Sequence, residues 1–146
     1  MNGQMSVSDV LESALYVLDL QAAEEFYTDV LGLKFYSKLE GRHVFLRCGN
    51  RMVLLFNAEA TAVSAGGPRD APTHGATGEG HLAFAAMDRE IDQWKQHLVE
   101  NGVEIEKEIH TQGGRSIYFR DPSQNCLEIA SPRIWGIPEE TISSRA

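Results

Sequence analysis

The chain has little positive charge and no long apolar run, and each shortage excludes a class of protein. Its 146 residues include 13 lysines and arginines against 21 acidic residues, a formal net charge of −8. Nucleic-acid binding depends on clusters of basic side chains, and no run of Lys or Arg occurs here. Purely apolar stretches such as residues 52–56 are far too short to cross a bilayer. We therefore expect neither nucleic acid nor a membrane as a partner.

Cysteine is scarce as well. Cys48 and Cys126 alone cannot build a disulfide framework, and residues 1–10 contain neither the basic residues nor the apolar segment of a secretion signal. A reducing, cytoplasmic location is therefore expected. With 42% apolar and 23% charged residues the chain can bury a core, and its length fits a single domain.

What the sequence does contain is an internal repeat. The segment GRHVFLRCGN resembles GRSIYFRDPSQN further along the chain, and ESALYVLDL resembles HLAFAAMDR. Between these blocks apolar residues recur at helical spacing, which predicts helices near residues 21–31 and 88–101. Gly32 and Gly102 follow these segments as stop signals. Each half therefore reads as one strand, one helix and three further strands.

The repeat predicts an α+β fold of two tandem βαβββ modules that form a curved mixed sheet around a cavity. Module one would span about residues 11–57 and module two about residues 80–132, with a C-terminal tail over 133–146. Residues 58–79 between the modules are rich in Gly, Ala, Pro and Thr and lack periodicity. We expect this segment to be a linker or a mobile lid.

Alternation of side chains along each strand lets the repeat assign an inner face. Counted from the Asn that both halves share, this face carries Glu12, Val53, His81 and Glu128 at equivalent places, beside mostly small residues. A carboxylate buried alone is strongly unfavourable, and a divalent cation removes that cost. The pattern predicts a metal site of Glu12, His81 and Glu128, with Val53 at a vacant fourth place.

Three segments, YVLDLQAAEEFYTDVLGLKF, GHLAFA and RSIYFRDPSQNCLEIASP, resemble the vicinal oxygen chelate superfamily. It includes glyoxalase I, fosfomycin-resistance enzymes, methylmalonyl-CoA epimerase, extradiol dioxygenases and bleomycin-resistance proteins. The resemblance covers about Leu11 to Pro132 and implies paired βαβββ modules around a metal. Glu12, His81 and Glu128 match positions at which family members place ligands. Because such proteins commonly pair their modules through a homodimer, a homodimer is expected.

The chain departs from each of these groups at a ligand position. Glyoxalase I and the epimerases resemble a four-ligand pattern, with an acid or an amide at the position that Val53 occupies in this chain. Glu12 stands where extradiol dioxygenases and fosfomycin-resistance enzymes have a first histidine. Ser116 and Tyr118 match positions that the fosfomycin-resistance enzymes use near substrate, but the preceding loop, EIHTQGG, lacks their Lys. Substrate and reaction therefore stay open.

Three protein ligands leave coordination positions free, as in a catalytic rather than a structural metal site. Two carboxylates and one imidazole would suit Zn, Mn, Fe, Ni or Mg without selecting one of them. A substrate with adjacent oxygens could chelate such a metal, which would then act as a Lewis acid. Glu12 or Glu128 could also leave the metal and serve as a base.

Further candidates would line the cavity. His43 aligns with Ser116 in the repeat, Arg120 could hold an anionic substrate, and His74 could enter from the linker. The expected function is that of a divalent-metal-dependent enzyme acting on a small molecule that chelates the metal through oxygens. The alternative is a metal-free small-molecule binding protein of the bleomycin-resistance type. Three ligating groups facing one point favour the enzyme.

Overall fold

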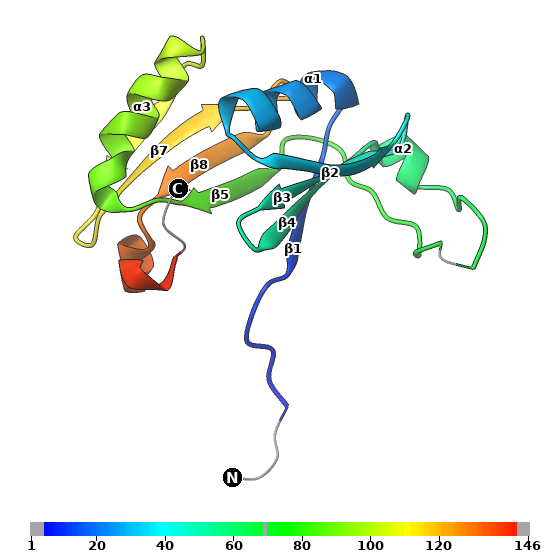
Figure 1. Cartoon of the computed structure of the whole chain (residues 1–146), viewed down its shortest axis with the longest axis horizontal. Coiled ribbons are helices and arrows are strands. Elements are labelled where there is room, and N and C mark those ends of the chain that lie inside the picture. Colours follow the sequence, from blue (N-terminus) through cyan, green and yellow to red (C-terminus); the bar gives the residue numbers. More distant parts are fainter. Residues whose placement is uncertain (1–4, 69, 143–146) are drawn as a thin grey trace.

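The computed structural model describes residues 5–68 and 70–142, and it folds them into two halves with the same order of elements (Figure 1). The first half consists of β1 (Glu12–Tyr16), α1 (Leu20–Glu25), its π-helical continuation η1 (Phe26–Val30), β2 (Lys34–Leu39), β3 (His43–Cys48) and β4 (Arg51–Phe56). The second half consists of β5 (His81–Ala85), the 3-10 turn η2 (Asp88–Glu90), α3 (Ile91–Glu100), β6 (Lys107–His110), β7 (Arg115–Arg120) and β8 (Cys126–Ala130). A short helix, α2 (Ala58–Thr61), follows β4, and two 3-10 turns, η3 (Pro132–Trp135) and η4 (Glu139–Thr141), follow β8.

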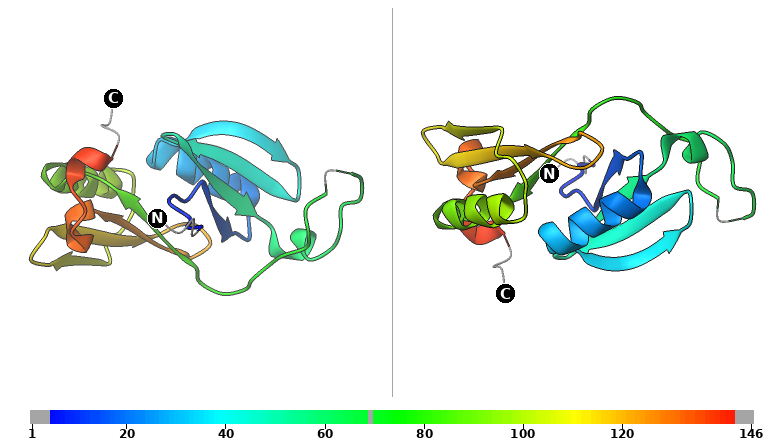
Figure 2. Two further views of the ribbon diagram at one scale, coloured as in Figure 1. Left: turned by 90° about the horizontal axis from the view of Figure 1, so that it is seen from below. Right: turned by 90° about the horizontal axis from the view of Figure 1, so that it is seen from above.

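Each half forms a four-stranded sheet, and the two sheets have the same topology. Their strand orders are β1-β4-β3-β2 and β5-β8-β7-β6. In each sheet the first strand pairs parallel with the last, and the other pairs are antiparallel. Helix α1 packs on β3 and β4, and α3 packs on β7 and β8. The predicted α+β fold of two βαβββ modules is confirmed. The two sheets lie side by side, and the chain between α2 and β5 projects beyond the first half (Figure 2).

The predicted helices are present, and local chemistry sets their ends. Asp19 caps α1 by accepting a hydrogen bond from the backbone N–H of Ala22 at 3.0 Å. Ala23 and Tyr27, four residues apart on one side of the helix, are fully buried. Gly32 and Gly102 follow the helices of the two halves with φ of 78° and 77°, a conformation that glycine adopts without strain. None of the helices in the described part of the chain is long and apolar enough to cross a membrane.

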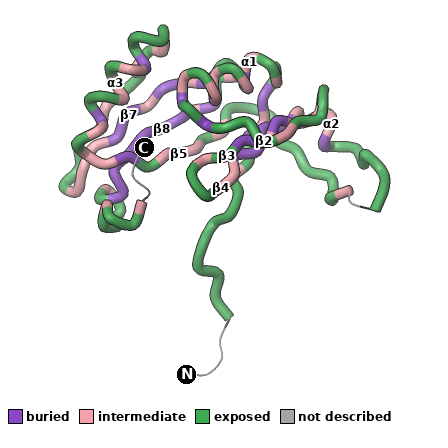
Figure 3. The backbone as a smooth tube through the Cα atoms, viewed as in Figure 1, coloured by how far each residue is buried: buried purple, intermediate pink, exposed green. Residues whose placement is uncertain are grey.

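The core lies between the sheets and the helices, where Figure 3 shows the buried strand segments. Alternate strand residues supply it, as the period of two requires. Its fully buried members include Leu46, Leu55, Ile91, Leu98, Ile117, Phe119 and Leu127. The opposite faces of the strands are thereby left to form the site.

The register of β4 corrects the prediction for Val53. Val53 packs in the core and is only 4% exposed, so it cannot line the cavity. Arg47 pairs with Met52 across the first turn, whereas Arg120 pairs with Cys126 across the second, which is one residue longer. The alignment of the two halves from their shared Asn was therefore wrong by one residue. A shift of one residue exchanges the two faces of a strand. The true equivalent of Glu128 in the first half is Leu54.

A buried hydrogen-bond network joins the two halves at Asn125, in the loop between β7 and β8. The Asn125 Nδ2 donates to the carbonyl of Tyr16 on β1 and to Asp121, both at 3.0 Å. Its Oδ1 accepts from the N–H of Gly80, just before β5, at 2.7 Å. The Tyr27 hydroxyl donates to Asp121 at 2.8 Å, and burial together with the Asp121 charge raises the pKa of Tyr27. One side chain thus connects both first strands with the helix of the first half.

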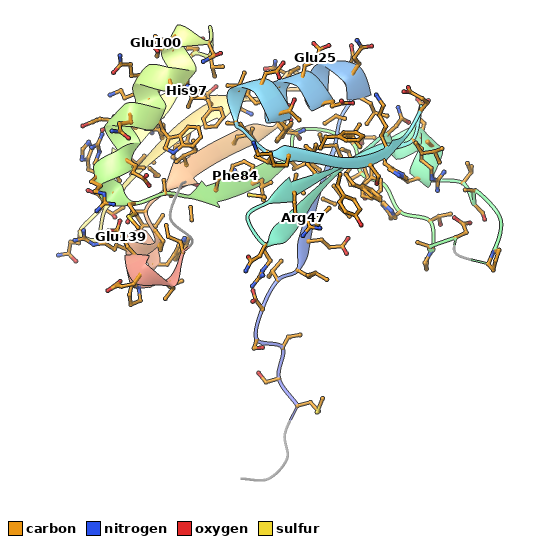
Figure 4. The ribbon with its side chains drawn as sticks, viewed as in Figure 1. Glu25, Arg47, Phe84, His97, Glu100 and Glu139 are labelled. Atoms are coloured by element: carbon orange, nitrogen blue, oxygen red, sulfur yellow. The ribbon has the colours of Figure 1, made fainter. Side chains whose placement is uncertain are left out.

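A second contact joins the helical layers above the sheets. His97, labelled on α3 in Figure 4, lies with its Nε2 2.6 Å from the carbonyl oxygen of Val30 in η1. Because a carbonyl oxygen only accepts, Nε2 carries the proton. The halves are therefore held together at the strand ends and again between their helices.

Replacing Asn125 by Ala should lower the free energy of unfolding by about 3 kcal/mol, because several buried polar groups lose their partners at once. Urea denaturation of the two proteins measures this difference. As a control, Gln96→Ala removes an exposed hydrogen bond to Glu100 and should change stability by less than about 0.5 kcal/mol. Equal midpoints for wild type and Asn125→Ala would show that the network does not hold the halves together.

Candidate metal and ligand site

His81 and Glu128 meet on the inner face of the second sheet. Strand β5 runs parallel to β8, with His81 beside Cys126 and Ala83 beside Glu128. The imidazole Nε2 lies 3.3 Å from Glu128 Oε1. The side chain of Glu128 is only 8% exposed, whereas that of His81 is 53% exposed. The pair therefore has a buried carboxylate behind an accessible ring.

The other nitrogen of His81 determines what this pair can hold. Its Nδ1 lies 2.8 Å from the carbonyl oxygen of Cys126, which can only accept, so Nδ1 carries a proton. In the neutral ring, Nε2 is then a lone-pair acceptor that faces a carboxylate, another acceptor. Two acceptors this close repel each other unless a proton or a metal ion lies between them. A histidine oriented by a backbone carbonyl is a frequent arrangement at metal sites.

Tyr118 and Ser116 extend this site along β7. Tyr118 lies opposite Glu128 across the β7–β8 pair, and its ring is 6.3 Å from that of His81 at 17°. Burial raises the pKa of Tyr118, and the neighbouring Glu128 charge also raises it. The phenol stays protonated and can donate a hydrogen bond. Ser116 is buried two residues earlier on the same face.

Arg120 lies on the same strand, but its charge is engaged. Its guanidinium contacts Glu106 at 3.0 Å and Glu79 at 3.2 Å, and it also donates to the carbonyl of Gln124. Two carboxylates offset one cation, which leaves little attraction for an anionic substrate.

Glu12 is not part of this cluster. Across the described part of the chain, no group of three His, Cys, Asp or Glu side chains is placed to hold a metal ion. Glu12 begins β1 and lines a separate cavity of about 790 Å³ on the inner face of the first sheet. One chain thus brings together His81, Glu128 and Tyr118, and it leaves Glu12 on the other sheet.

The cavity of the first half is walled by rings. His43 and Phe45 come from β3, Phe56 comes from β4, and His74 comes from the segment between the halves. The Tyr16 hydroxyl lies 2.7 Å from Nδ1 of His74 and fixes that ring. His43 and His74 were expected from the sequence, whereas the aromatic residues were not. Phe45 could have been found, because it stands in the repeat where Tyr118 does, but the one-residue shift in β4 hid Phe56.

The contact between Tyr16 and His74 should keep residues 70–78 close to the cavity. Removing the hydroxyl by Tyr16→Phe should raise the hydrogen-exchange rate of the His74 amide about fivefold, since this amide bonds the Thr61 carbonyl and loses its side-chain anchor. Mass-spectrometric exchange measures this. The control Tyr36→Phe removes an exposed hydroxyl on β2 and should leave the rate unchanged. Equal His74 rates in wild type and Tyr16→Phe would mean that the contact does not hold the segment.

Comparison with known proteins identifies the family. Residues 10–129 match the family described as the Glyoxalase/Bleomycin resistance protein/Dioxygenase superfamily. The metallothiol transferase FosB of Staphylococcus epidermidis is 30% identical over 128 residues, which cover 86% of this chain and 82% of that protein. A lactoylglutathione lyase structure from Agrobacterium tumefaciens is 39% identical with a TM-score of 0.85, covering 91% of this chain and all of the other. TnmS3, an antibiotic-binding protein from Streptomyces, shares the fold at 22% identity with a TM-score of 0.66, covering 88% of this chain and 98% of the other. The chain belongs to the glyoxalase/bleomycin resistance protein/dioxygenase superfamily.

Proposed function

We propose that the chain is a divalent-metal-dependent enzyme acting on a small molecule that binds the metal through neighbouring oxygens. The observation that carries this proposal is the pair of acceptors, His81 Nε2 and Glu128 Oε1, at 3.3 Å. Imidazole and carboxylate are ligands that suit Zn, Mn, Fe, Ni or Mg. Two similar proteins are named as enzymes, a metallothiol transferase and a lactoylglutathione lyase, and they support the proposal that this chain is an enzyme.

A homodimer would complete the site. Each chain has two ligands on the second sheet and Glu12 on the inner face of the first sheet, and a twofold axis can bring Glu12 of one copy to His81 and Glu128 of the other. Exposed apolar side chains are available to form the interface. They include Val10 and Leu11, in the segment that extends away from the fold in Figure 1, and Phe35, Tyr36 and Leu39 on the edge strand β2.

The residues of the chain then have distinct tasks. His81, Glu128 and the second copy's Glu12 would hold the metal, which when bound supplies Lewis-acid stabilisation of negative charge on a chelated oxygen. The protonated phenol of Tyr118 can donate a hydrogen bond to a substrate oxygen beside Glu128. Glu12 or Glu128 would leave the metal and serve as the base that accepts a proton from the substrate.

Loss of either ligand on the second sheet should abolish metal binding. We expect His81→Ala and Glu128→Gln to bind at least about tenfold less metal than wild type after reconstitution, while remaining folded. Elemental analysis by mass spectrometry measures metal content, and circular dichroism checks the fold. The matched control is His110→Ala, because His110 also faces a carboxylate, Glu108, at 2.7 Å on the exposed strand β6.

Metal affinity should also fall as the pH is lowered, because protons compete for His81 and for the carboxylates. A wild-type protein that takes up none of Zn, Mn, Fe, Ni or Mg would contradict the proposal. The metal-free binding protein would then be the better description, since the ring-walled cavity needs no metal to admit a ligand.

Sharing of the site between two copies can be tested by complementation. Glu12→Gln and His81→Ala chains each lack one ligand and should bind no metal alone. A mixed dimer would combine the intact Glu12 of one chain with the intact His81 and Glu128 of the other. Refolding the two variants together in equal amounts should therefore restore about a quarter of wild-type metal content, from random pairing in a twofold dimer. No recovery in the mixture would contradict a metal site shared between two copies.

A further inference from the structure

The cavity of the first half has features that the proposed metal chemistry does not use. Its volume of about 790 Å³ lies within the range of small-molecule sites, which are mostly apolar with a few polar groups. Leu39, Met52 and Leu54 supply aliphatic surface beside the rings. Glu12, the proposed third metal ligand, stands in the same lining. A substrate bound to the metal therefore has this cavity next to it.

The rings of the cavity are fixed by contacts with one another. Phe56 stands at steep angles to three rings: Phe45 at 5.7 Å and 77°, His43 at 6.1 Å and 75°, and His74 at 4.6 Å and 78°. His43 and Phe45 are stacked at 3.9 Å and 6°. Edge-to-face and stacked pairs are the favoured geometries of aromatic groups. The wall therefore offers preformed flat faces and edges to a ligand.

The charged side chains Arg42 and Asp70 of this wall already have hydrogen-bond partners within the protein. Burial, with the charge of Arg42, lowers the pKa of His43, so its ring is neutral at neutral pH. The Arg42 guanidinium donates to the carbonyls of Ala60 at 2.7 Å and Val63 at 3.4 Å. Hydrogen bonds from Ser64 and Gly66, and then the Arg42 charge, lower the pKa of Asp70, so this carboxylate is ionised at neutral pH and is held by those two donors. Among the described lining residues, Glu12 is the remaining charged side chain, and in the proposed site it would bind the metal.

We propose that this cavity holds an uncharged aromatic group of the substrate, placed beside the oxygens that chelate the metal. The inference rests on the proposed function, because the metal ligand Glu12 defines which end of the cavity faces the reacting atoms. A flat ring gains stacking and edge contacts with Phe45, Phe56 and His74 that a methyl group cannot make. A charged group would lose its hydration against the aliphatic and aromatic surface of the cavity.

Two chelating probes that differ in one group test this. Mandelate and lactate share a hydroxyl next to a carboxylate and carry phenyl and methyl groups respectively. With metal-loaded protein, calorimetry should show mandelate binding about tenfold or more tightly than lactate. Phe45→Leu should reduce this preference about fivefold and leave lactate binding unchanged. The control Phe35→Leu alters an exposed ring on β2 outside the cavity and should preserve the preference.

A probe without chelating oxygens separates this inference from the metal proposal. Benzyl alcohol should shift the NMR signals of Phe45 and His74 in metal-free wild type and equally in His81→Ala. Such shifts in a protein that takes up no metal would support the cavity and contradict only the metal proposal. Equal binding of mandelate and lactate to metal-loaded wild type, without shifts from benzyl alcohol, would overturn the cavity proposal and leave the metal proposal standing.

Discussion

The arrangement of both halves depends on one buried amide side chain. Asn125 bonds the end of β1, the residue before β5 and the carboxylate of Asp121. Glycine suits position 80 at this junction, since a Cβ there would lie 3.0 Å from the Asn125 side chain and 3.0 Å from that of Leu15 and would push both aside slightly. The two first strands are therefore adjacent, and the sheets extend side by side. For that reason the inner faces of one chain do not enclose a common centre, and the proposed three-ligand site would need a second copy.

The same fold carries different chemistry in its two halves. The equivalent inner positions hold Leu54 and Phe56 in the first sheet but Glu128 and Ala130 in the second, as the pairing of β4 with β3 and of β8 with β7 shows. Phe45 in the first half likewise corresponds to Tyr118 in the second. Substituting rings for polar groups leaves the core faces untouched, because strand alternation keeps the two faces independent. One half can therefore recognise a ligand while the other holds polar and ligating groups.

Much of the fold followed from patterns that are local in sequence. Helix periodicity with terminal glycines and alternating strands required no knowledge of tertiary contacts, and these predictions were confirmed. Val53 was misplaced because the two turns differ in length, and which of their residues are equivalent is settled only by the pairing of the strands. Glu12 was grouped with His81 and Glu128 by repeat symmetry, which does not distinguish one chain from two. The aromatic cavity was missed because Phe45 and Phe56 look like ordinary strand residues until the segment carrying His74 is placed beside them.

Tyr16 belongs to both the junction and the cavity. Its carbonyl accepts from Asn125, while its hydroxyl meets His74 and its ring lies 6.1 Å from that of Phe56. A displacement of one half against the other moves this residue and thereby alters the ring wall. Occupation of the cavity and the mutual position of the halves would then be thermodynamically linked, and linkage is reciprocal. A ligand that fits the rings would favour one orientation of the two sheets, and whatever favours that orientation would tighten the ligand's binding by the same free energy.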